Sequence, residues 1–377
     1  MQVQFNKPYI TGKEIVYINE CINTGIIRGD GEFTKKVTEL LQETMKSNKI
    51  LLTTSCTHAL ELAVLETNIG PGDEVILPSY TFVSTANPIV LRGAKIVFAD
   101  IELETLNIDL DDVERKITPK TKAIIPVHYA GVSCDMDRLL RIAKEKNIIV
   151  IEDAAQAVYS KYKDKYLGTI GDFGCFSFHE TKNYVCGEGG AISINLEDQN
   201  MVENAEIIRE KGTNRSKFFR GQVDKYTWVN YGSSYLPSDL LAAFLLAQLE
   251  ERDTIYTKRK EIYEYYYKNL IDLEKQGKLR MPRIPEFCTS NYHMFYVLCN
   301  SENERDYLMS ELKKKGISSV FHYLPLHSSP FGNKLGCKTG DLPVTERVGA
   351  TLLRLPMFAD LSKEQLDYVI ESIKSII

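Results

Sequence analysis

Short apolar runs alternate with helix-like segments through the first two-thirds of the chain. The runs are typical of buried strands, because each contains about four to eight mainly apolar residues. We expect strands within residues 51–55, 73–79, 94–101, 121–131, 148–157, 174–179 and 189–195. Helical segments are expected between them at 57–67, 81–93 and 134–147. Buried strands separated by helices predict a mostly parallel sheet with helices on its faces.

The pattern changes near residue 238. Residues 238–273 have the periodicity of one long helix. Beyond it we expect a strand, a helix, a strand and a last helix, at 291–299, 301–316, 317–327 and 363–376. The chain is too long for one simple core. We therefore predict a large α/β domain over residues 1–245 and a smaller α+β domain over 246–377, joined by the long helix.

Composition excludes several classes of protein. Hydrophobic residues make up 44% of the 377 residues and charged residues 26%, which is typical of a folded globular chain. A net charge of −5 gives no overall basic footprint for nucleic acid. No apolar run approaches the roughly 18 residues of a membrane helix, and the first residues have no apolar core like that of a signal peptide. We expect a cytoplasmic protein with no nucleic-acid or membrane partner.

The eight cysteines are scattered, with no CxxC pair. Such spacing does not suggest a metal site, so none is expected. Free thiols in a reducing compartment are the natural interpretation.

Polar clusters follow the predicted strands where each one ends. In parallel sheets of this kind, ligands bind at the carboxyl ends of the strands. We therefore expect a functional site where these clusters meet. In chain order the clusters are TTSCT (53–57), PSYTF (78–82), PVHYAG (126–131), EDAAQA (152–157) and SFHETKN (177–183).

Two of these clusters carry residues that suggest chemistry. Lys182 follows a strand, and a lysine in a tight pocket can have its pKa lowered and become a nucleophile toward aldehydes. Asp153 ends another strand, where a carboxylate can keep a pyridine nitrogen protonated. Gln156 can donate to a ring hydroxyl. Taken singly, a solvated loop lysine and a helix-capping aspartate are the commoner roles of such residues.

The other clusters fit a phosphate and a flat ring. Ser55, Cys56 and Thr57 open a helix whose first amides can bind an anion, although plain helix capping explains them equally well. Phe82 could stack on a ring or belong to the core. His128 could contact a ligand or be a hydrogen-bonded structural histidine.

Taken in order, these motifs resemble the sugar aminotransferases of the DegT/DnrJ/EryC1/StrS family. The resemblance covers essentially the whole chain and includes NYHMFYV (291–297), HYLPLH (322–327) and LRLPMF (353–358). It implies the fold of the fold-type I, aspartate-aminotransferase-like enzymes that use pyridoxal 5′-phosphate (PLP). It also implies pyridoxamine phosphate (PMP) as the intermediate cofactor form.

The resemblance assigns roles residue by residue. Lys182 matches the Schiff-base lysine, and Asp153 and Gln156 match the partners of the ring nitrogen and ring oxygen. Phe82 matches the stacking aromatic residue. The phosphate contacts are matched by Ser55, Cys56 through its backbone amide, Thr57 and Ser177.

The resemblance also implies partners. It implies a nucleotide-linked 4-keto-6-deoxy sugar as acceptor, L-glutamate as donor, and a homodimer in which each subunit completes its neighbour's site. Residues 209–228 carry the closest match to members that act on such a sugar. Candidate substrate contacts are His179, Tyr184, Arg220, Lys225 and Tyr226.

The chain departs from the family at two places. Ser234 stands where the family usually has an asparagine that reaches the neighbour's phosphate, and a serine has a shorter reach. His179 and Glu180 replace the commoner Tyr/His-Pro pair. Alternatives are amination of another sugar or another carbon, and a non-catalytic regulator on this fold. A related dehydratase is disfavoured because Lys182 is present.

Overall fold

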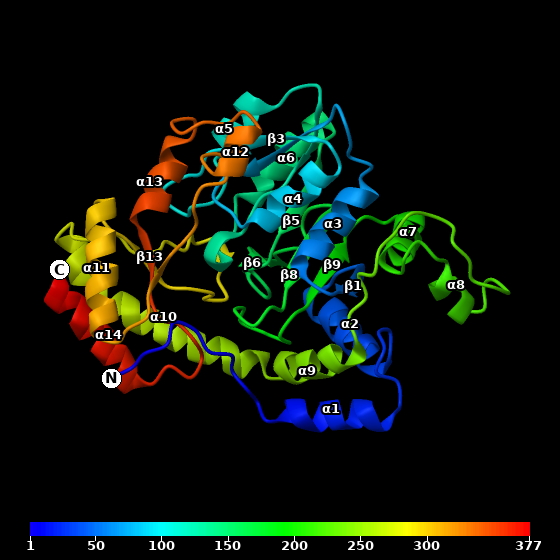
Figure 1. Ribbon diagram of the computed structural model, residues 1–377, viewed down its shortest axis with the longest axis horizontal. Coiled ribbons are helices and arrows are strands. Elements are labelled where there is room, and N and C mark those ends of the chain that lie inside the picture. Colours follow the sequence, from blue (N-terminus) through cyan, green and yellow to red (C-terminus); the bar gives the residue numbers. More distant parts are fainter.

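The large domain is built on a seven-stranded sheet. The computed structural model describes residues 1–377, and the strand order is β1-β9-β8-β5-β4-β2-β3 (Figure 1). The strands are β1 (Lys49–Thr53), β2 (Glu74–Pro78), β3 (Lys95–Ala99), β4 (Thr121–Ile124), β5 (Ile149–Asp153), β8 (Phe173–Ser177) and β9 (Gly190–Ile194). Only β9 runs antiparallel to its neighbours. The prediction of a mostly parallel sheet is confirmed.

Alternating side chains bury both faces of this sheet. In β1, Ile50 and Leu52 pack with α2, α6 and α9, whereas Leu51 packs on the opposite face with α3, α4 and α7. This period of two explains why the strands are apolar throughout. The helices of the large domain are α1 (Lys13–Asn23), α2 (Glu32–Met45), α3 (Cys56–Glu66), α4 (Val83–Leu91), α5 (Leu110–Lys116), α6 (Met136–Lys146), α7 (Gln199–Arg209), α8 (Arg215–Phe219) and α9 (Asp239–Glu250), with a 3₁₀ turn, η1 (Tyr129–Gly131).

The small domain packs helices on a three-stranded antiparallel sheet of order β11-β13-β12. Its elements are α10 (Arg252–Lys275), β11 (Tyr296–Leu298), α11 (Glu302–Lys314), β12 (Val320–Phe321), α12 (Pro330–Lys334), α13 (Pro343–Thr351), β13 (Leu352–Arg354) and α14 (Lys363–Ile376). A third small sheet joins β6 (Lys161–Tyr162), β7 (Lys165–Tyr166) and β10 (Cys288–Thr289). The predicted last helix is thus found at the expected residues.

The expected single helix over 238–273 is wrong, because the chain makes two helices. The helix α9 ends at Glu250 and α10 begins at Arg252, and Glu251 between them has φ −97° and ψ 19°. Lys13 pairs with Glu251 at 2.8 Å at this break. No glycine or proline marks it, so the apolar pattern runs on without a signal.

The predicted strands at 291–299 and 317–327 are much shorter in the structure, at three and two residues. The start of the first is diverted into polar contacts with the large domain. The backbone N–H of Asn291 donates to the Ser160 hydroxyl at 2.9 Å, and its carbonyl accepts from the Asn183 side-chain amide at 2.8 Å. Hydrogen bonds that would continue a strand are therefore used to hold the two domains together.

The division of the chain at residue 245 is too simple. Val3 lies in the small-domain core, and its amide donates to the carbonyl of Gly316 at 2.9 Å. Within α10, Ile255 packs in the large domain and Ile262 in the small one. The first residues therefore belong with the small domain, and the chain crosses between the domains inside α10.

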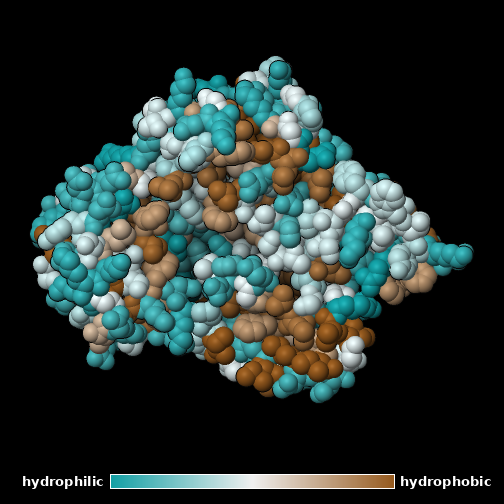
Figure 2. Space-filling view, in the orientation of Figure 1, coloured by the Kyte–Doolittle hydropathy of each residue, from teal (hydrophilic) through white to brown (hydrophobic).

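Two outer segments are visible in Figure 1. The segment with α8 projects away from the body at one end, and α1 lies along the outside of α9. Figure 2 shows an apolar patch over α1, and the exposed residues there include Ile15, Val16 and Ile22.

No helix is both long enough and apolar enough to cross a membrane. All eight cysteines are free thiols, as predicted.

Candidate active site

A cavity of about 570 Å³ lies between the two domains, and a hydrophilic hollow is visible there in Figure 2. Its walls come from the carboxyl ends of the large-domain strands, from the loop after β8, and from the small domain. It gathers nine of the predicted site residues. These are Ser55, Cys56, Thr57, Phe82, Asp153, Gln156, Ser177, His179 and Lys182.

Lys182 sits in a tightly held loop after β8. Its backbone amide donates to the carbonyl of His179 at 2.9 Å. The next residue, Asn183, is buried, donates to the carbonyl of Asn291 at 2.8 Å and contacts Nδ1 of His293 at 2.9 Å. Removal from bulk water lowers the pKa of Lys182. A fixed lysine with a depressed pKa is suited to react as a free amine.

Asp153 ends β5 and is buried in the floor of the cavity. Its Oδ2 accepts from the Thr85 hydroxyl at 2.8 Å, and its Oδ1 accepts from the Ala155 amide at 3.1 Å. Burial raises the pKa of Asp153, and these two hydrogen bonds oppose that rise. The carboxylate is thus held in one orientation and would be stabilised further by a positively charged ligand atom.

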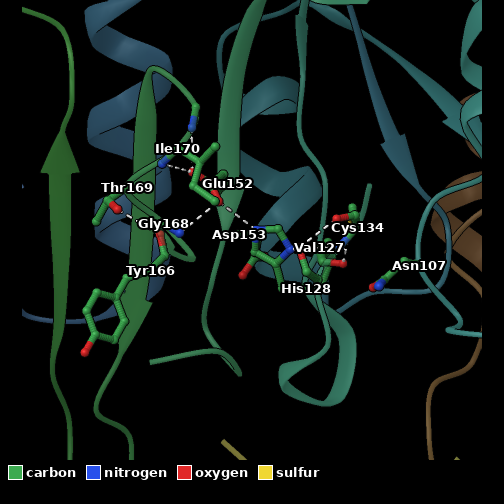
Figure 3. Close-up of polar contacts among 12 residues, drawn as sticks. Asn107, Val127, His128, Cys134, Glu152, Asp153, Tyr166, Gly168, Thr169 and Ile170 are labelled. Carbon is green, nitrogen blue, oxygen red and sulfur yellow. Dashed lines mark hydrogen bonds and ion pairs between the residues drawn. The ribbon is translucent and has the colours of Figure 1, made fainter. Parts of the chain in front are cut away.

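The neighbouring Glu152 points away from the cavity into a buried polar network (Figure 3). Its Oε2 contacts His128 Nε2 and accepts from the Gly168 amide, both at 2.8 Å. Its Oε1 accepts from the amides of Ile170 and Gly171 at 2.7 and 2.6 Å. His128 is fully buried and does not line the cavity. Of its two possible roles, the structural one is found.

The start of α3 forms an anion cradle. The Ser55 hydroxyl caps the helix by accepting from the His58 amide at 3.2 Å. The amides of Cys56 and Thr57 are at the first two helical positions, where no intrahelical acceptor exists. A Cβ on Gly190 would lie 2.3 to 2.5 Å from backbone atoms of Ser55 and Cys56, so only glycine lets β9 approach this turn.

These donors fit a phosphorylated pyridine cofactor. Ser177 ends β8 opposite Gly190 and adds a hydroxyl beside the cradle. Free amides and hydroxyls at a helix N-terminus bind phosphate well. Asp153 is separate from this cradle and offers a carboxylate to a ring nitrogen, while Lys182 offers an amine. The residues present therefore match phosphate, ring and aldehyde together.

Two further predicted residues, Phe82 and Gln156, line the cavity where a cofactor ring would lie. The Phe82 ring is 57% exposed and lies 6.3 Å from the Tyr323 ring between centroids, so it is not a core residue. The Gln156 side chain accepts from the Ala130 amide at 2.7 Å and donates to the Tyr323 hydroxyl at 3.1 Å. One Nε2 hydrogen of Gln156 is left for a ligand oxygen.

Five predicted residues do not line this cavity: Ser234, Tyr184, Arg220, Lys225 and Tyr226. The prediction that Tyr184 binds substrate is contradicted, because its ring is buried in the large-domain core against Tyr159. The others are exposed and lie on or next to the projecting segment.

The sequence reasoning missed several residues of the cavity wall. Burial lowers the pKa of His293 and of His322 well below the ordinary value, so both imidazoles are neutral. Arg354 is the clearest omission, because a charged residue inside the apolar run LLRLP was a visible signal. The overlooked lining residues include Phe5, Asn6, Thr81, Glu188, His293, His322, Tyr323 and Arg354.

Comparisons with known proteins agree with this geometry. Residues 8–374 match the DegT/DnrJ/EryC1/StrS aminotransferase family. GDP-perosamine synthase of Escherichia coli O157:H7 is 36% identical, over 97% of this chain and 96% of that protein. A pleiotropic regulatory protein of Geobacillus stearothermophilus is 38% identical, over 84% of this chain and 81% of its own length.

Solved structures of a similar protein include forms with the cofactor. The putative sugar aminotransferase Spr1654 from Streptococcus pneumoniae superposes with a TM-score of 0.93 at 30% identity, covering 100% of this chain and 98% of that one. Its apo, PLP and PMP forms are all known. The fold-type I prediction and the PLP prediction are confirmed. The chain belongs to the DegT/DnrJ/EryC1/StrS aminotransferase family and is a PLP-dependent sugar aminotransferase.

Proposed function

We propose that this enzyme transfers the amino group of L-glutamate to C4 of TDP-4-keto-6-deoxy-D-glucose. The products are TDP-4-amino-4,6-dideoxy-D-galactose and 2-oxoglutarate, and the amino sugar would supply a surface polysaccharide of the enterobacterial common antigen type. The observation that carries the reaction is that Lys182 and Asp153 line the same cavity. The similarity of residues 209–228 to enzymes that act on this sugar supports the acceptor.

Bound PLP supplies an electron-accepting ring that stores the amino group between the two half-reactions. Asp153, oriented by Thr85, holds a proton at the ring nitrogen. Burial lowers the pKa of the Lys182 amine, which favours Nζ as the base that takes the proton from the Cα of the donor. In the second half-reaction the same amine returns a proton to C4 of the sugar. The position of Nζ above one face of C4 would set the configuration of the product.

The remaining residues of the site would bind and orient the cofactor. The amides of Cys56 and Thr57, with the hydroxyls of Ser55 and Ser177, hold the phosphate. With the cofactor bound, the exposed Phe82 ring would cover the pyridine, and Gln156 would donate to the ring oxygen. The Ser55 hydroxyl already accepts from a backbone amide, so its own hydrogen is free to donate to a phosphate oxygen.

We place the projecting segment in the site of a second subunit. Ser234, Lys225 and Tyr226 are exposed and reach nothing in their own cavity. Arg220 is already engaged by Glu206 at 2.7 Å, whereas Lys225 forms no ion pair. In a homodimer with shared active sites, Lys225 is therefore the better candidate to meet the diphosphate. Lys225→Ala should raise the KM for the nucleotide sugar more than Arg220→Ala does.

One incubation tests the proposal. PLP-loaded enzyme is mixed with L-glutamate and TDP-4-keto-6-deoxyglucose, and NMR reads the configuration at C4. Lys182→Ala should form less than one equivalent of amino sugar, whereas Lys374→Ala, on the surface of α14, should match wild type. Many turnovers by Lys182→Ala would overturn the role given to Lys182. An equatorial amine at C4 would overturn the galactose product.

Two alternatives have specific support. The name GDP-perosamine synthase suggests a GDP-linked acceptor, which the same NMR assay tests when GDP-4-keto-6-deoxymannose is supplied. The name of the regulatory relative suggests a non-catalytic protein. A regulator would show no turnover with any keto sugar even after PLP is added, and its absorbance would not change with L-glutamate.

A further inference from the structure

His293 is a buried histidine on the cavity wall, and only one of its two ring nitrogens has a partner. Its Nδ1 contacts Oδ1 of Asn183 at 2.9 Å, whereas its Nε2 makes no hydrogen bond. By contrast, the buried His327 uses both nitrogens, with Ser79 at 2.7 Å and Glu346 at 2.8 Å. Buried polar atoms are normally paired. The open nitrogen of His293 therefore suggests a partner that arrives within the cavity.

The partner of Nδ1 fixes where the ring proton of His293 lies. The side-chain nitrogen of Asn183 donates to the backbone carbonyl of Asn291 at 2.8 Å, so the Asn183 atom turned toward the ring is an oxygen, which can only accept. Burial lowers the pKa of His293 well below its ordinary value, so the neutral ring carries one proton. That proton is on Nδ1, and Nε2 is left with a lone pair.

The ring is held firmly beside the loop that carries Lys182. Arg259, on α10, donates from Nε to the carbonyl of Tyr292 at 3.0 Å and from Nη2 to the carbonyl of His293. Asn183 directly follows Lys182, so its contact with Nδ1 ties the ring to that loop. After burial, the charge of Lys182 contributes most to lowering the pKa of His293, as expected for two side chains that lie close together.

The amine of Lys182 needs an acceptor of this kind. Its Nζ forms no salt bridge and no hydrogen bond, although the side chain is removed from bulk water. When Nζ takes the proton from the Cα of the donor, it becomes an ammonium, and a buried ammonium without a partner is unfavourable. A carboxylate at this place would hold the proton firmly. A neutral lone pair stabilises the ammonium and still lets it pass the proton on.

We propose that His293 is a positioning residue, whose Nε2 accepts a hydrogen bond from the protonated Lys182 amine while that amine moves a proton. This inference rests on the proposed function, which gives Lys182 a proton transfer in each half-reaction. As the Cα–H bond of the donor breaks, the proton passes to Nζ and the electron pair stays on the carbon side. One N–H of the ammonium then donates to Nε2, and His293 itself is never protonated.

Two substitutions separate the roles of the two ring nitrogens. His293→Asn keeps an N–H donor near the position of Nδ1 and removes the acceptor, whereas His293→Gln places an amide oxygen near the position of Nε2. His293→Asn should slow both half-reactions by about tenfold to 100-fold, the range for one hydrogen bond to a charged group, and His293→Gln should restore much of the rate. The apparent dissociation constant of L-glutamate and the KM for the keto sugar should change less than about threefold.

Cofactor absorbance follows each half-reaction, with L-glutamate that carries either hydrogen or deuterium at Cα. The isotope effect in His293→Asn should be at least as large as in wild type, because proton transfer is the step that slows. Uptake of PLP by cofactor-free enzyme gives a second reading, since only the free amine reacts. Without the acceptor the pKa of Lys182 falls, so the midpoint of uptake should move to lower pH by about one unit in His293→Asn. His327→Asn, which cuts two buried contacts outside the cavity, should change neither the isotope effect nor this midpoint.

The inference is overturned if His293→Asn performs as well as His293→Gln, which would leave the ring only its structural contact with Asn183. It is overturned equally if only the KM for the keto sugar rises, which would assign Nε2 to a hydroxyl of the sugar. Failure of the proposed function is a different result. Wild type would then complete the amino-acid half-reaction, with its His293 dependence, but not aminate the keto sugar.

Discussion

Replacing Glu152 by glutamine should destabilise the enzyme strongly, although Glu152 does not line the cavity. Its two carboxylate oxygens receive four contacts, from the amides of Gly168, Ile170 and Gly171 and from His128. A glutamine has one oxygen and one NH₂ group. Whichever way it is turned, the NH₂ group faces two donors.

The loss of folding free energy follows from the number of hydrogen bonds that Glu152→Gln removes. If the NH₂ group replaces Oε2, the Gly168 amide loses its acceptor, and His128 must change tautomer to accept. The new Nδ1 hydrogen would then face the Cys134 amide, which lies 3.4 Å from Nδ1. The Gly168 bond to the carboxylate is worth about 1.5 to 3 kcal/mol and the Cys134 bond to the imidazole about 0.5 to 1.5 kcal/mol, so the loss is about 2 to 4.5 kcal/mol.

The assay is thermal unfolding of the PLP-loaded protein. At roughly 2 °C per kcal/mol, Glu152→Gln should lower the Tm by roughly 4 to 9 °C. Glu371→Gln is the matched control, because its side chain is exposed and pairs only with Lys374 on one surface turn. That change should be worth less than about 0.5 kcal/mol. A Tm for Glu152→Gln within 2 °C of the control would refute the reasoning that the carboxylate stabilises this network.

Three further predictions follow from buried groups. Burial raises the pKa of Glu66 to about 7, so between about pH 4.5 and 7 the folded chain holds a proton that the unfolded chain has released, and stability falls as pH rises. Glu66→Gln should remove that slope, giving a higher Tm than wild type at pH 8 and an equal one at pH 4.5. Gly190→Ala forces a Cβ into the backbone at the start of α3 and should weaken PLP binding more than about tenfold by absorbance titration, whereas Gly70→Ala, where a Cβ would come no closer than 3.9 Å to the Arg92 carbonyl oxygen, should not. Thr85→Val removes a donor to the ionised Asp153 carboxylate, so the pKa of that carboxyl should rise and the acid limb of the kcat profile should move to higher pH, by about half a unit or more.

The predicted residues that the structure brings to the cavity share one property. Each of them, such as Lys182, Asp153 and Ser177, sits at or just after the end of a large-domain strand. A parallel sheet brings those ends together whatever the details of packing, so order along the chain was enough to group them. Thr85 is one turn into a helix after such an end, and nothing in its own spacing predicted the hydrogen bond to Asp153.

The residues that sequence missed reach the cavity by longer routes. Phe5 comes from the chain start, which lies on the small domain, and Arg354 and Tyr323 come from its sheet and loops. Their positions depend on how the small domain packs against the large one, which no local pattern encodes. Tyr184 shows the opposite error. Two residues after Lys182, it was predicted to reach the substrate, yet its ring points into the core.

The separation between the residues at the strand ends and those from the small domain and the projecting segment has a chemical consequence. The strand ends supply Lys182, Asp153 and the anion cradle, to which we assign the cofactor and the steps common to any aminotransferase reaction. The small domain supplies Arg354 and Tyr323 to the cavity wall, and the projecting segment carries Lys225, which we propose to meet the substrate of a second subunit. Because the cofactor site rests on one rigid sheet and the substrate contacts on separate elements, donor and acceptor selectivity can change without altering the Lys182–Asp153 pair. Substitutions at Arg354 and Lys225 should accordingly shift KM for different substrates, while PLP binding stays within about threefold of wild type.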